Sequence, residues 1–397
     1  MSRWRCRTTN PPRNKGPQKS HPAAQAPNGK IEGLYDNEYS NEDILEKLMR
    51  FFFFRKKNWE ICISISLKRR RMMKSRIIGT GSYLPPKVLT NFDLEEKVDT
   101  SDEWITSRSG IRERRIVETD VATSDLGAQA ALRALEMAGL SPEDLDLIIT
   151  GTNTPDMFFP CTSCFIQAKI GAQKAAGFDV SAGCTSFIHA LSLADKFIKE
   201  DPRRKVMALG AEVMSKVMDW KDRGTCVLFG DGAGAVILTG EEGERGVLST
   251  HLHSDGSLWE LLYMPGGGSA NPSSPDTVNK NLHCLKMAGN QLFKVAVRSL
   301  AEVSQEAMQF NGLQSEDIDY MIPHQANVRI IEAAAKMVNF PLEKVYLTID
   351  RYGNTSAATI PIALDEINRE GKLKAGNLIL MCSFGTGVTW GGAVVRW

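Results

Sequence analysis

The amino-acid sequence predicts an α/β protein built from two similar halves, each with a mostly parallel sheet covered by helices. The first observation is an alternation beyond Met73. Short β-branched, apolar runs alternate there with longer stretches in which apolar residues recur at helical spacing. The second is an internal repeat, because residues 139–149 (GLSPEDLDLII) are echoed by residues 312–322 (GLQSEDIDYMI). The two observations together indicate a duplicated fold.

The individual elements follow from these patterns. Buried strands are predicted at residues 145–151, 206–210, 233–238, 320–323, 377–382 and 393–396. Amphipathic helices are predicted at residues 124–138, 185–200, 289–310, 326–338 and 358–370. A second echo pairs residues 229–232 (FGDG) with 384–387 (FGTG), each leading into an apolar strand. We therefore expect an N-terminal half over 73–245 and a C-terminal half over 246–397, with the functional site between them at the carboxyl ends of strands.

The first 72 residues differ in composition from the rest. They hold 16 Lys/Arg against 7 Asp/Glu, whereas the other 325 residues hold 32 against 40, so the net charge of +1 conceals a basic segment joined to an acidic core. We favour a start placed too far upstream of Met72 and Met73, and we expect disorder in this segment. An organelle transit peptide is the second interpretation, and a basic arm for RNA or an anionic membrane is the third.

Composition argues against several classes of protein. A nearly neutral charge argues against a dedicated nucleic-acid-binding protein, and no apolar run approaches the ~18 residues of a membrane span. Eight cysteines are too few for a disulfide framework, which favours a cytoplasmic location, or a plastid or other organelle if the basic segment is a transit peptide. Cys161 and Cys164 form a lone CxxC, which we interpret as two small half-buried residues rather than a metal or redox site.

Cys184 lies where a predicted strand end at residues 178–180 turns through Ser-Ala-Gly into the helix predicted at 185–200. A cysteine at a helix N-terminus has its thiolate favoured by the helix dipole and by free N–H groups. The arrangement is similar to a nucleophile elbow with sulfur in place of oxygen. Taken alone, however, the pattern fits a small buried cysteine better than a nucleophile.

Two further residues sit at turns in the second half. His324 follows the strand predicted at 320–323 and precedes a helix, which is the counterpart of a functional position in the first half. Asn354 lies in a small polar turn before the last predicted helix, where its amide could donate into a cleft or cap the helix. The loop around Thr386 offers backbone N–H groups between two glycines.

Longer motifs resemble those of the β-ketoacyl-acyl-carrier-protein synthase III family from about Ile77 to Trp397. They are residues 79–85 (GTGSYLP), 99–105 (DTSDEWI), 110–114 (GIRER), 222–225 (DRGT), 229–234 (FGDGAG), 253–256 (HSDG), 323–327 (PHQAN) and 353–357 (GNTSA). The resemblance implies a thiolase-like duplicated fold. It also implies condensation of an acyl-CoA primer, acetyl-CoA first, with malonyl-acyl-carrier-protein to initiate fatty acid synthesis.

By this resemblance, Cys184 is the acylated nucleophile, and His324 and Asn354 donate N–H groups to the enolate formed when the malonyl thioester loses CO2. The backbone N–H groups of Cys184 and Thr386 would stabilise the tetrahedral oxyanion. A Cys-His-Asn set separates the chain from elongating synthases and thiolases, and it implies no metal or redox cofactor.

The resemblance also implies where substrates and partners bind. Trp104 and Arg108 match positions that hold the adenine region of CoA, with Arg223 on the same rim. Arg329 and Gln325 match positions that receive the acidic carrier protein. Phe159 matches a residue that closes the acyl pocket across a dimer interface, so a homodimer is implied. The alternative for each arginine is a surface ion pair.

Two departures from the family pattern bear on the primer. Thr185-Ser186 follows the nucleophile where smaller residues are usual, and Thr386 stands where glycine or alanine is usual. Primer choice therefore stays open. A related acyl-CoA condensing enzyme of secondary metabolism, using another primer or acceptor, is the nearest alternative. A non-catalytic carrier-binding scaffold on the same fold is the alternative from a different class.

Overall fold

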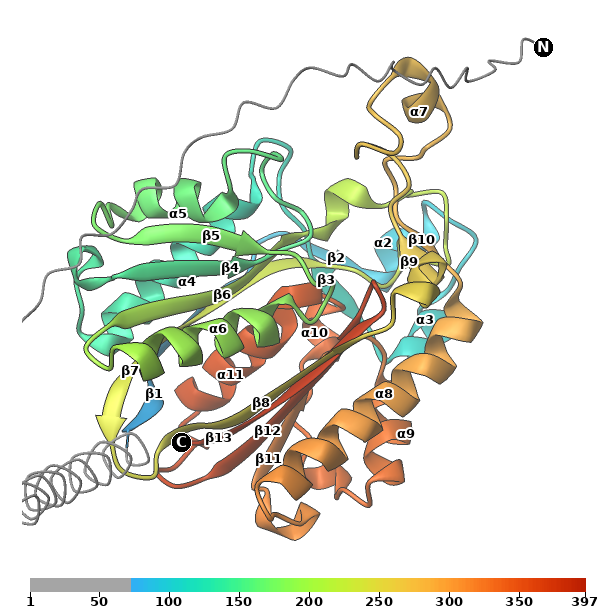
Figure 1. The fold of residues 1–397 in the computed structure, drawn as a ribbon. Helices are drawn as coiled ribbons and strands as arrows, with labels where there is room; N and C mark the ends of the chain where they lie inside the picture. The colour runs from blue at the N-terminus through green and yellow to red at the C-terminus, as the bar shows by residue number, and fades with distance from the viewer. Residues whose placement is uncertain (1–72) are drawn as a thin grey trace, which may run out of the picture. The chain divides into compact units, whose positions relative to one another are not determined.

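The structure, a computed structural model, describes residues 73–397 and contains two main sheets (Figure 1). One has five strands in the order β1-β7-β6-β4-β5, and the other has four in the order β11-β12-β13-β8. The strands are β1 (Met73–Tyr83), β4 (Leu147–Gly151), β5 (Ala176–Val180), β6 (Lys205–Val213), β7 (Asp231–Glu242), β8 (Gly246–Ser254), β11 (Tyr320–Pro323), β12 (Leu378–Gly385) and β13 (Thr389–Arg396). The predicted basic segment lies outside the described residues.

The two sheets repeat one arrangement, since the order β1-β7-β6-β4 recurs as β8-β13-β12-β11. The pairs β4–β5, β4–β6 and β11–β12 are parallel. β7 and β13 are antiparallel to both of their neighbours, so all other strands of each sheet share one direction. This arrangement confirms the predicted α/β fold with duplicated, mostly parallel sheets. The reversed strands β7 and β13 were not predicted.

Helices form three layers around the two sheets (Figure 1). An outer pair packs on the five-stranded sheet, a second outer pair packs on the four-stranded sheet, and a middle pair lies between the sheets. The pair on the five-stranded sheet is α4 (Thr123–Ala138) with α5 (Thr162–Ile170). The pair on the four-stranded sheet is α8 (Gly289–Phe310) with α9 (Val328–Met337). The middle pair is α6 (Ser186–Glu200) with α11 (Thr359–Arg369).

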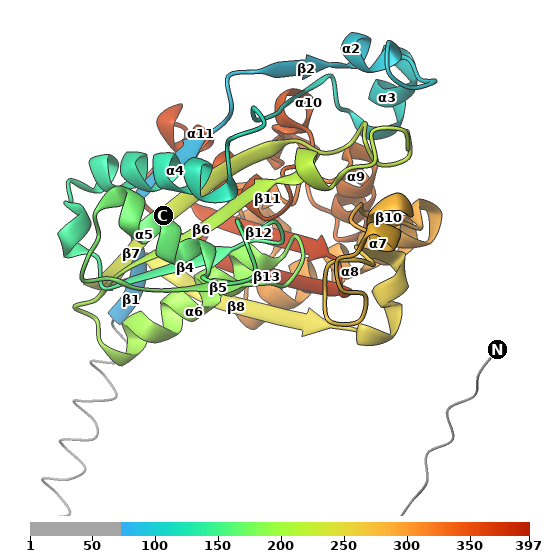
Figure 2. The same cartoon turned by 90° about the horizontal axis from the view of Figure 1, so that it is seen from above.

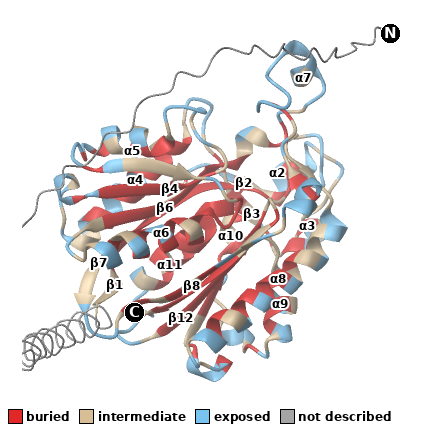
Figure 3. Ribbon diagram, in the orientation of Figure 1, coloured by how far each residue is buried: buried red, intermediate tan, exposed pale blue. Residues whose placement is uncertain are grey.

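The middle position of α6 and α11 follows from their sequences. On α6, Phe187, Leu191, Ala194 and Ile198 recur at helical spacing and are all buried. On α11, every residue from Thr359 to Asp365 is buried, and a helix that is covered all round belongs in the interior. Figure 3 shows buried residues across the strands and these two helices. The two sheets therefore share one core.

Smaller elements complete the fold and carry part of the site. The two-stranded sheets pair β2 (Val88–Thr90) with β3 (Glu113–Arg115) and β9 (Leu262–Tyr263) with β10 (Lys286–Met287), and the short helices are α2 (Asn91–Glu95), α3 (Asp102–Ser109), α7 (Pro275–Asn279) and α10 (Ile349–Tyr352). The 3-10 helices are η1 (Pro142–Asp144), η2 (Met214–Val217), η3 (Gly256–Leu261), η4 (Ser315–Asp317), η5 (Leu342–Lys344) and η6 (Ser356–Ala358). Figure 2 shows α2, α3 and β2 on the side of the molecule where α9 and α10 lie.

The predicted strands and helices are confirmed, with ends that shift by a few residues. Residues 243–245 link β7 of the five-stranded sheet to β8 of the four-stranded sheet, and the division into halves at 245 and 246 stays a prediction. β1 was not predicted, because Gly79 and Gly81 interrupt its apolar pattern. α5 was not predicted either, because its sequence has almost no apolar stripe. Over residues 73–397, no helix combines the length and apolar character needed to cross a membrane.

Candidate active site

Cys184 lies in the turn between β5 and α6, as the sequence predicts, and it is buried. The turn is tight because Gly183 adopts a φ of +61°, which favours glycine. A β-carbon at Gly183 would lie 2.6 Å from the backbone nitrogen of Thr386. The turn that holds Cys184 is thus packed directly against the loop between β12 and β13 of the other half.

The contact between these two turns leaves two backbone donors free. Ser383 Oγ donates to the Cys184 carbonyl oxygen at 2.9 Å, and Thr389 Oγ1 donates to the Ala182 carbonyl oxygen at 2.7 Å. Neither the N–H of Cys184 nor that of Thr386 donates to another residue of the described chain. The predicted pair of oxyanion donors is therefore brought together and left unpaired, although Gly385 rather than Thr386 lines the adjoining cavity.

His324 follows β11, and its backbone N–H donates to the Cys382 carbonyl oxygen at 2.8 Å. Burial lowers the pKa of His324 to about 3, so the imidazole is neutral at physiological pH. Its Nδ1 is buried and lacks a hydrogen-bond partner within residues 73–397. Because Nδ1 is buried and unpaired, Nε2 is the nitrogen that can donate to a ligand in the cavity.

Asn354 is held so that its amide donor is free. Its N–H donates to the Leu228 carbonyl oxygen at 2.8 Å, and its own carbonyl oxygen accepts from Gly230 N at 3.0 Å. The side-chain Oδ1 accepts from Ser356 N at 2.8 Å, whereas Nδ2 has no partner in the described part of the chain. Oδ1 therefore supports the backbone at the start of η6, and Nδ2 is free to donate into the cavity.

One cavity of about 650 Å³ joins these residues, since Cys184, His324 and Asn354 all line it. Arg108 on α3 and Arg329 on α9 line the same cavity. The structure therefore brings together the three predicted catalytic residues and two of the predicted binding residues. No group of three or more His, Cys, Asp or Glu within residues 73–397 is arranged to hold a metal.

The predicted CoA-binding residues form a cluster on α3 and the loop before β7. Trp104 has the Arg108 guanidinium over its ring at 4.6 Å and the Arg223 guanidinium at 5.2 Å. Arg223 also donates to the backbone carbonyl oxygen of Asp99 at 2.6 Å and forms an ion pair with the Asp99 carboxylate at 3.2 Å. Asn327 Nδ2 donates to the Arg108 carbonyl oxygen at 2.9 Å, which ties this cluster to the loop after His324.

Gln325 corrects the sequence prediction, which placed it at the carrier-protein surface. The residue is fully buried, and its Nε2 donates to the carbonyl oxygens of Pro323 and Tyr346 at 3.0 and 3.1 Å. Its Oε1 accepts from Thr348 N at 3.1 Å. With its amide groups used internally, Gln325 fixes the loop of His324 and has nothing left for a partner. Arg329, by contrast, lines the cavity and lies over the Phe293 ring at 5.7 Å.

The electrostatics of Cys184 also differ from the sequence prediction. Burial raises the pKa of the Cys184 thiol to about 12, and the charge of Glu212 raises it further, while a hydrogen bond from Ser356 acts against them. α6 begins at Ser186, two residues after Cys184. The resting sulfur is therefore a thiol, and its proton must leave before it can attack a thioester.

Sequence reasoning missed Ser356, which contacts the nucleophile from outside its own segment, and Glu212, which Ser356 connects to the nucleophile. Ser356 Oγ lies 3.4 Å from Cys184 Sγ and 3.0 Å from Glu212 Oε1. A buried acid in an otherwise apolar strand (Lys205–Val213, KVMALGAEV) is the signal that could have drawn attention to Glu212.

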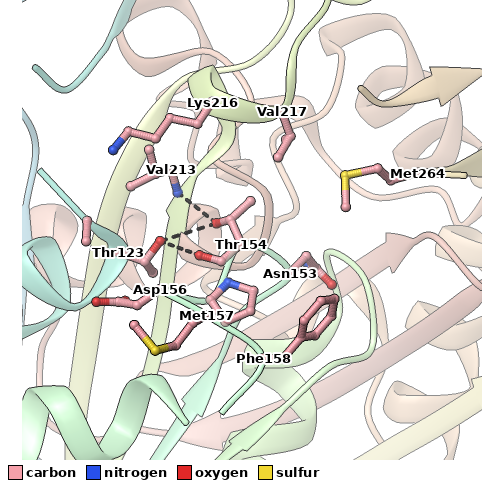
Figure 4. Close-up of a pocket in the computed structure, with 12 residues that line it drawn as sticks. Thr123, Asn153, Thr154, Asp156, Met157, Phe158, Val213, Lys216, Val217 and Met264 are labelled. Carbon is pink, nitrogen blue, oxygen red and sulfur yellow. Dashed lines mark hydrogen bonds between the residues drawn. The ribbon is translucent and has the colours of Figure 1, made fainter. Parts of the chain in front are cut away.

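Phe159 lies away from the cavity of Cys184. Its side chain is 83% exposed, and its neighbours Phe158 and Met157 are 76% and 51% exposed. Phe158 and Met157 line a second cavity of about 290 Å³, which Figure 4 shows beside Thr154 and Met264. Three consecutive exposed apolar residues are unusual on a solvent-facing surface.

The chain resembles known proteins in both sequence and structure. Two family models match it: 3-oxoacyl-[acyl-carrier-protein (ACP)] synthase III over residues 178–256, and the C-terminal part of the same synthase over residues 308–397. The first range contains Cys184, and the second contains His324 and Asn354. Among curated proteins, the β-ketoacyl-[acyl-carrier-protein] synthase III of Caldanaerobacter subterraneus subsp. tengcongensis is 54% identical over 321 residues, which are 81% of this chain and 97% of the relative.

Solved structures show the same likeness. The 3-oxoacyl-[acyl-carrier-protein] synthase III of Aquifex aeolicus is 51% identical and superimposes with a TM-score of 0.76, covering 81% of this chain and all of that one. The priming β-ketosynthase of the R1128 polyketide pathway is 34% identical with a TM-score of 0.76, covering 82% of this chain and 96% of that one.

Proposed function

Because the chain belongs to the β-ketoacyl-[acyl-carrier-protein] synthase III family, the condensing acyltransferases that initiate fatty acid synthesis, we propose that Cys184, His324 and Asn354 carry out that condensation. Acyl carrier protein is the substrate partner of this family. The observation that supports the assignment of roles is the single cavity lined by all three side chains. Acetyl-CoA as the primer is part of the proposal.

In the first half-reaction, Cys184 attacks the carbonyl carbon of the acyl-CoA thioester, and the CoA thiolate leaves. The negative charge on the tetrahedral oxygen is stabilised by the unpaired N–H groups of Cys184 and Thr386. Because both donors are already fixed by the packed turns around Gly183, they need no reorganisation during the reaction.

In the second half-reaction, malonyl-carrier loses CO2, and the enolate oxygen accepts from His324 Nε2 and Asn354 Nδ2. The carbanion then attacks the acyl carbon on Cys184, which forms the C–C bond and releases the sulfur. A neutral imidazole suits this step, because it donates an N–H without protonating the carbanion. We propose that the reaction needs no cofactor beyond its two thioester substrates.

The product assay tests this function directly. The purified protein is incubated with a panel of acyl-CoAs and malonyl-carrier, and mass spectrometry identifies the acyl-carrier product. We expect a 3-oxoacyl-carrier two carbons longer than the primer, with acetyl-CoA preferred. Charging of Cys184 without condensation on malonyl-carrier would contradict the proposal.

A second candidate is a condensing enzyme that uses another primer or acceptor in secondary metabolism. The observation that favours it is the equal TM-score of the priming polyketide ketosynthase, together with Thr185-Ser186 beside the nucleophile. The same panel separates the two functions, because a preference for a branched or longer primer over acetyl-CoA favours this second candidate.

We propose that Trp104 and Arg108 bind the adenine end of acyl-CoA, with Arg223 beside them. Replacing Trp104 by alanine should raise the KM for acetyl-CoA about 10-fold with little change in kcat, since a cation–π stack is worth ~1–2 kcal/mol. Acetyl-pantetheine lacks the adenine, so wild type and variant should use it equally well. The matched control is Trp220→Ala, a tryptophan near Lys97 that does not line the cavity. An unchanged KM in the Trp104 variant would contradict this role.

We propose that Arg329 contributes to docking of the carrier protein, since it lies at the cavity on α9 and carries a charge opposite to that of an acidic partner. The six free cysteines of the described chain support a cytoplasmic, reducing location as part of the proposal.

We propose a homodimer in which the exposed segment around Phe159 contacts the second copy. Replacing Phe159 by aspartate should weaken the dimer about 30-fold, because a buried aromatic anchor typically contributes ~2 kcal/mol or more. Sedimentation equilibrium should give twice the 43.8 kDa chain mass for wild type and a lower average for the variant. Phe92→Asp, at an isolated residue that is 66% exposed, is the matched control. A wild-type monomer would refute the dimer.

A further inference from the structure

A buried carboxylate lies behind the nucleophile and has no part in the chemistry described so far. Glu212, on β6, is fully buried, and its Oε1 lies 3.0 Å from the Ser356 hydroxyl. That hydroxyl lies 3.4 Å from Cys184 Sγ. The three side chains come from a strand, a 3-10 helix and a strand-to-helix turn, so the fold rather than local sequence aligns them.

Among residues 73–397, Glu212 is held by hydrogen-bond donors and not by a cation. Asn153 Nδ2 donates to it at 2.7 Å, Thr154 Oγ1 at 2.6 Å, and the backbone N–H groups of both residues at 3.1 Å. N–H groups can only donate, so they favour the ionised carboxylate. Burial acts in the opposite direction and raises the pKa of Glu212. A raised pKa makes Glu212 a stronger proton acceptor than an exposed carboxylate.

Ser356 offers one hydroxyl proton to two acceptors, Glu212 Oε1 and Cys184 Sγ. Its backbone has a φ of +49°, which is unfavourable for a residue other than glycine. The hydrogen bond from its N–H to Asn354 Oδ1 holds it there. A strained residue kept between an acid and a nucleophilic sulfur points to a functional reason for its position.

We propose that Glu212 accepts the proton of the Cys184 thiol through the Ser356 hydroxyl, which generates the thiolate that attacks acyl-CoA. The S–H bond breaks as its proton passes to Ser356 Oγ, and the proton that Ser356 carried forms a new O–H bond on Glu212. Ser356 is unchanged overall, and no co-reactant is needed. The inference rests on the proposed role of Cys184.

The same transfer removes the charge that opposes the thiolate. Within the described chain, the charge of Glu212 raises the pKa of the Cys184 thiol, whereas His324 at the cavity is neutral. The cationic side chains Arg108, Lys294 and Arg329 also line the cavity. Once Glu212 is protonated, it donates to Ser356 Oγ, and the Ser356 proton turns to the sulfur. Glu212 then keeps the proton while the acyl group occupies Cys184. The Cys184 thiolate released by condensation is therefore again next to a protonated Glu212.

The pH profile of Cys184 alkylation by iodoacetamide tests this relay, with the modified cysteine identified by peptide mass spectrometry. In wild type, internal proton transfer makes the rate nearly constant between about pH 6 and 8. In Glu212→Gln and Ser356→Gly, the proton must go to water, so the rate at pH 7 should fall about 100-fold and rise about tenfold per pH unit. Glycine suits the φ of Ser356, so this second variant keeps the test available if the first does not fold.

A merely electrostatic role for Glu212 predicts the opposite sign, because removing a nearby negative charge makes a thiol more acidic and faster to react. A folded Glu212→Gln protein that keeps the flat profile, or reacts faster than wild type at pH 7, would overturn the relay. The matched control is Asp231→Asn, another fully buried acid with a raised pKa that bonds Ser215 and Val117 instead, and it should keep the wild-type profile. Wild-type protein that acetyl-CoA cannot acetylate on Cys184 would instead refute the proposed function itself.

Discussion

Replacing Cys184 by alanine should abolish both acyl-enzyme formation and condensation, with a loss of at least about 10⁴-fold in kcat. The sulfur is the atom that bonds to the acyl group, and no second cysteine lines the cavity in the described chain. Intact-protein mass spectrometry after incubation with acetyl-CoA should show an acetyl adduct on wild type and none on the variant. Product formation from malonyl-carrier is measured in parallel.

The matched control for this change is Cys226→Ala. Cys226 is also buried and free, but it lies in a separate apolar cluster near Ile349 and does not line the cavity. This control should keep the adduct and the condensation. If Cys184→Ala still forms the product at a measurable fraction of the wild-type rate, the nucleophile has been misassigned. If neither wild type nor variant forms an adduct, acetyl-CoA is not the primer.

Replacing Asn354 by aspartate, or His324 by alanine, should separate the two half-reactions. The acetyl adduct should still form at close to the wild-type rate, while decarboxylative condensation falls by about 10²–10³-fold, the usual effect of removing one donor to a developing oxyanion. Asn354→Asp is the sharper change, because aspartate still accepts from Ser356 N and lacks only the free Nδ2 donor. The two rates are measured by single-turnover acetylation and by release of CO2 from malonyl-carrier.

The pH dependence of the second half-reaction provides a control on His324. With a pKa of about 3, the imidazole is neutral at every pH well above that value, so its N–H donor should not be lost or changed as pH falls from 8 to 5. An ordinary histidine would become charged over that range. A decarboxylation rate that titrates near pH 6.5 in wild type would contradict the neutral donor role of His324. An equal loss of acetylation and decarboxylation in both variants would contradict the division of roles between the half-reactions.

The positions of Cys184 and His324 were predictable from short stretches of sequence. Each follows a strand and precedes a helix, and the chain carries that pattern within a few residues. The alternation and the internal repeat likewise predicted the duplicated sheets. The reversed directions of β7 and β13 were not predictable in this way, because an apolar run is the same read in either direction.

Gln325 and Glu212 show where such reasoning fails. Gln325 follows His324 in the same motif, and only the fold reveals that its amide is used by Pro323, Tyr346 and Thr348. Glu212 meets Ser356 across 144 residues, a contact set by the packing of β6 against η6. No local pattern indicates which buried acid lies behind the nucleophile, and burial itself reverses the expected stabilisation of the Cys184 thiolate.

The most direct test of the central claim is a peptide map of all eight cysteines after reaction with acetyl-CoA, followed by addition of malonyl-carrier. The proposed mechanism predicts acetyl on Cys184 alone and its complete discharge by malonyl-carrier, with release of a 3-oxoacyl-carrier. Acetyl on another cysteine, or acetyl on Cys184 that malonyl-carrier does not discharge, would contradict it.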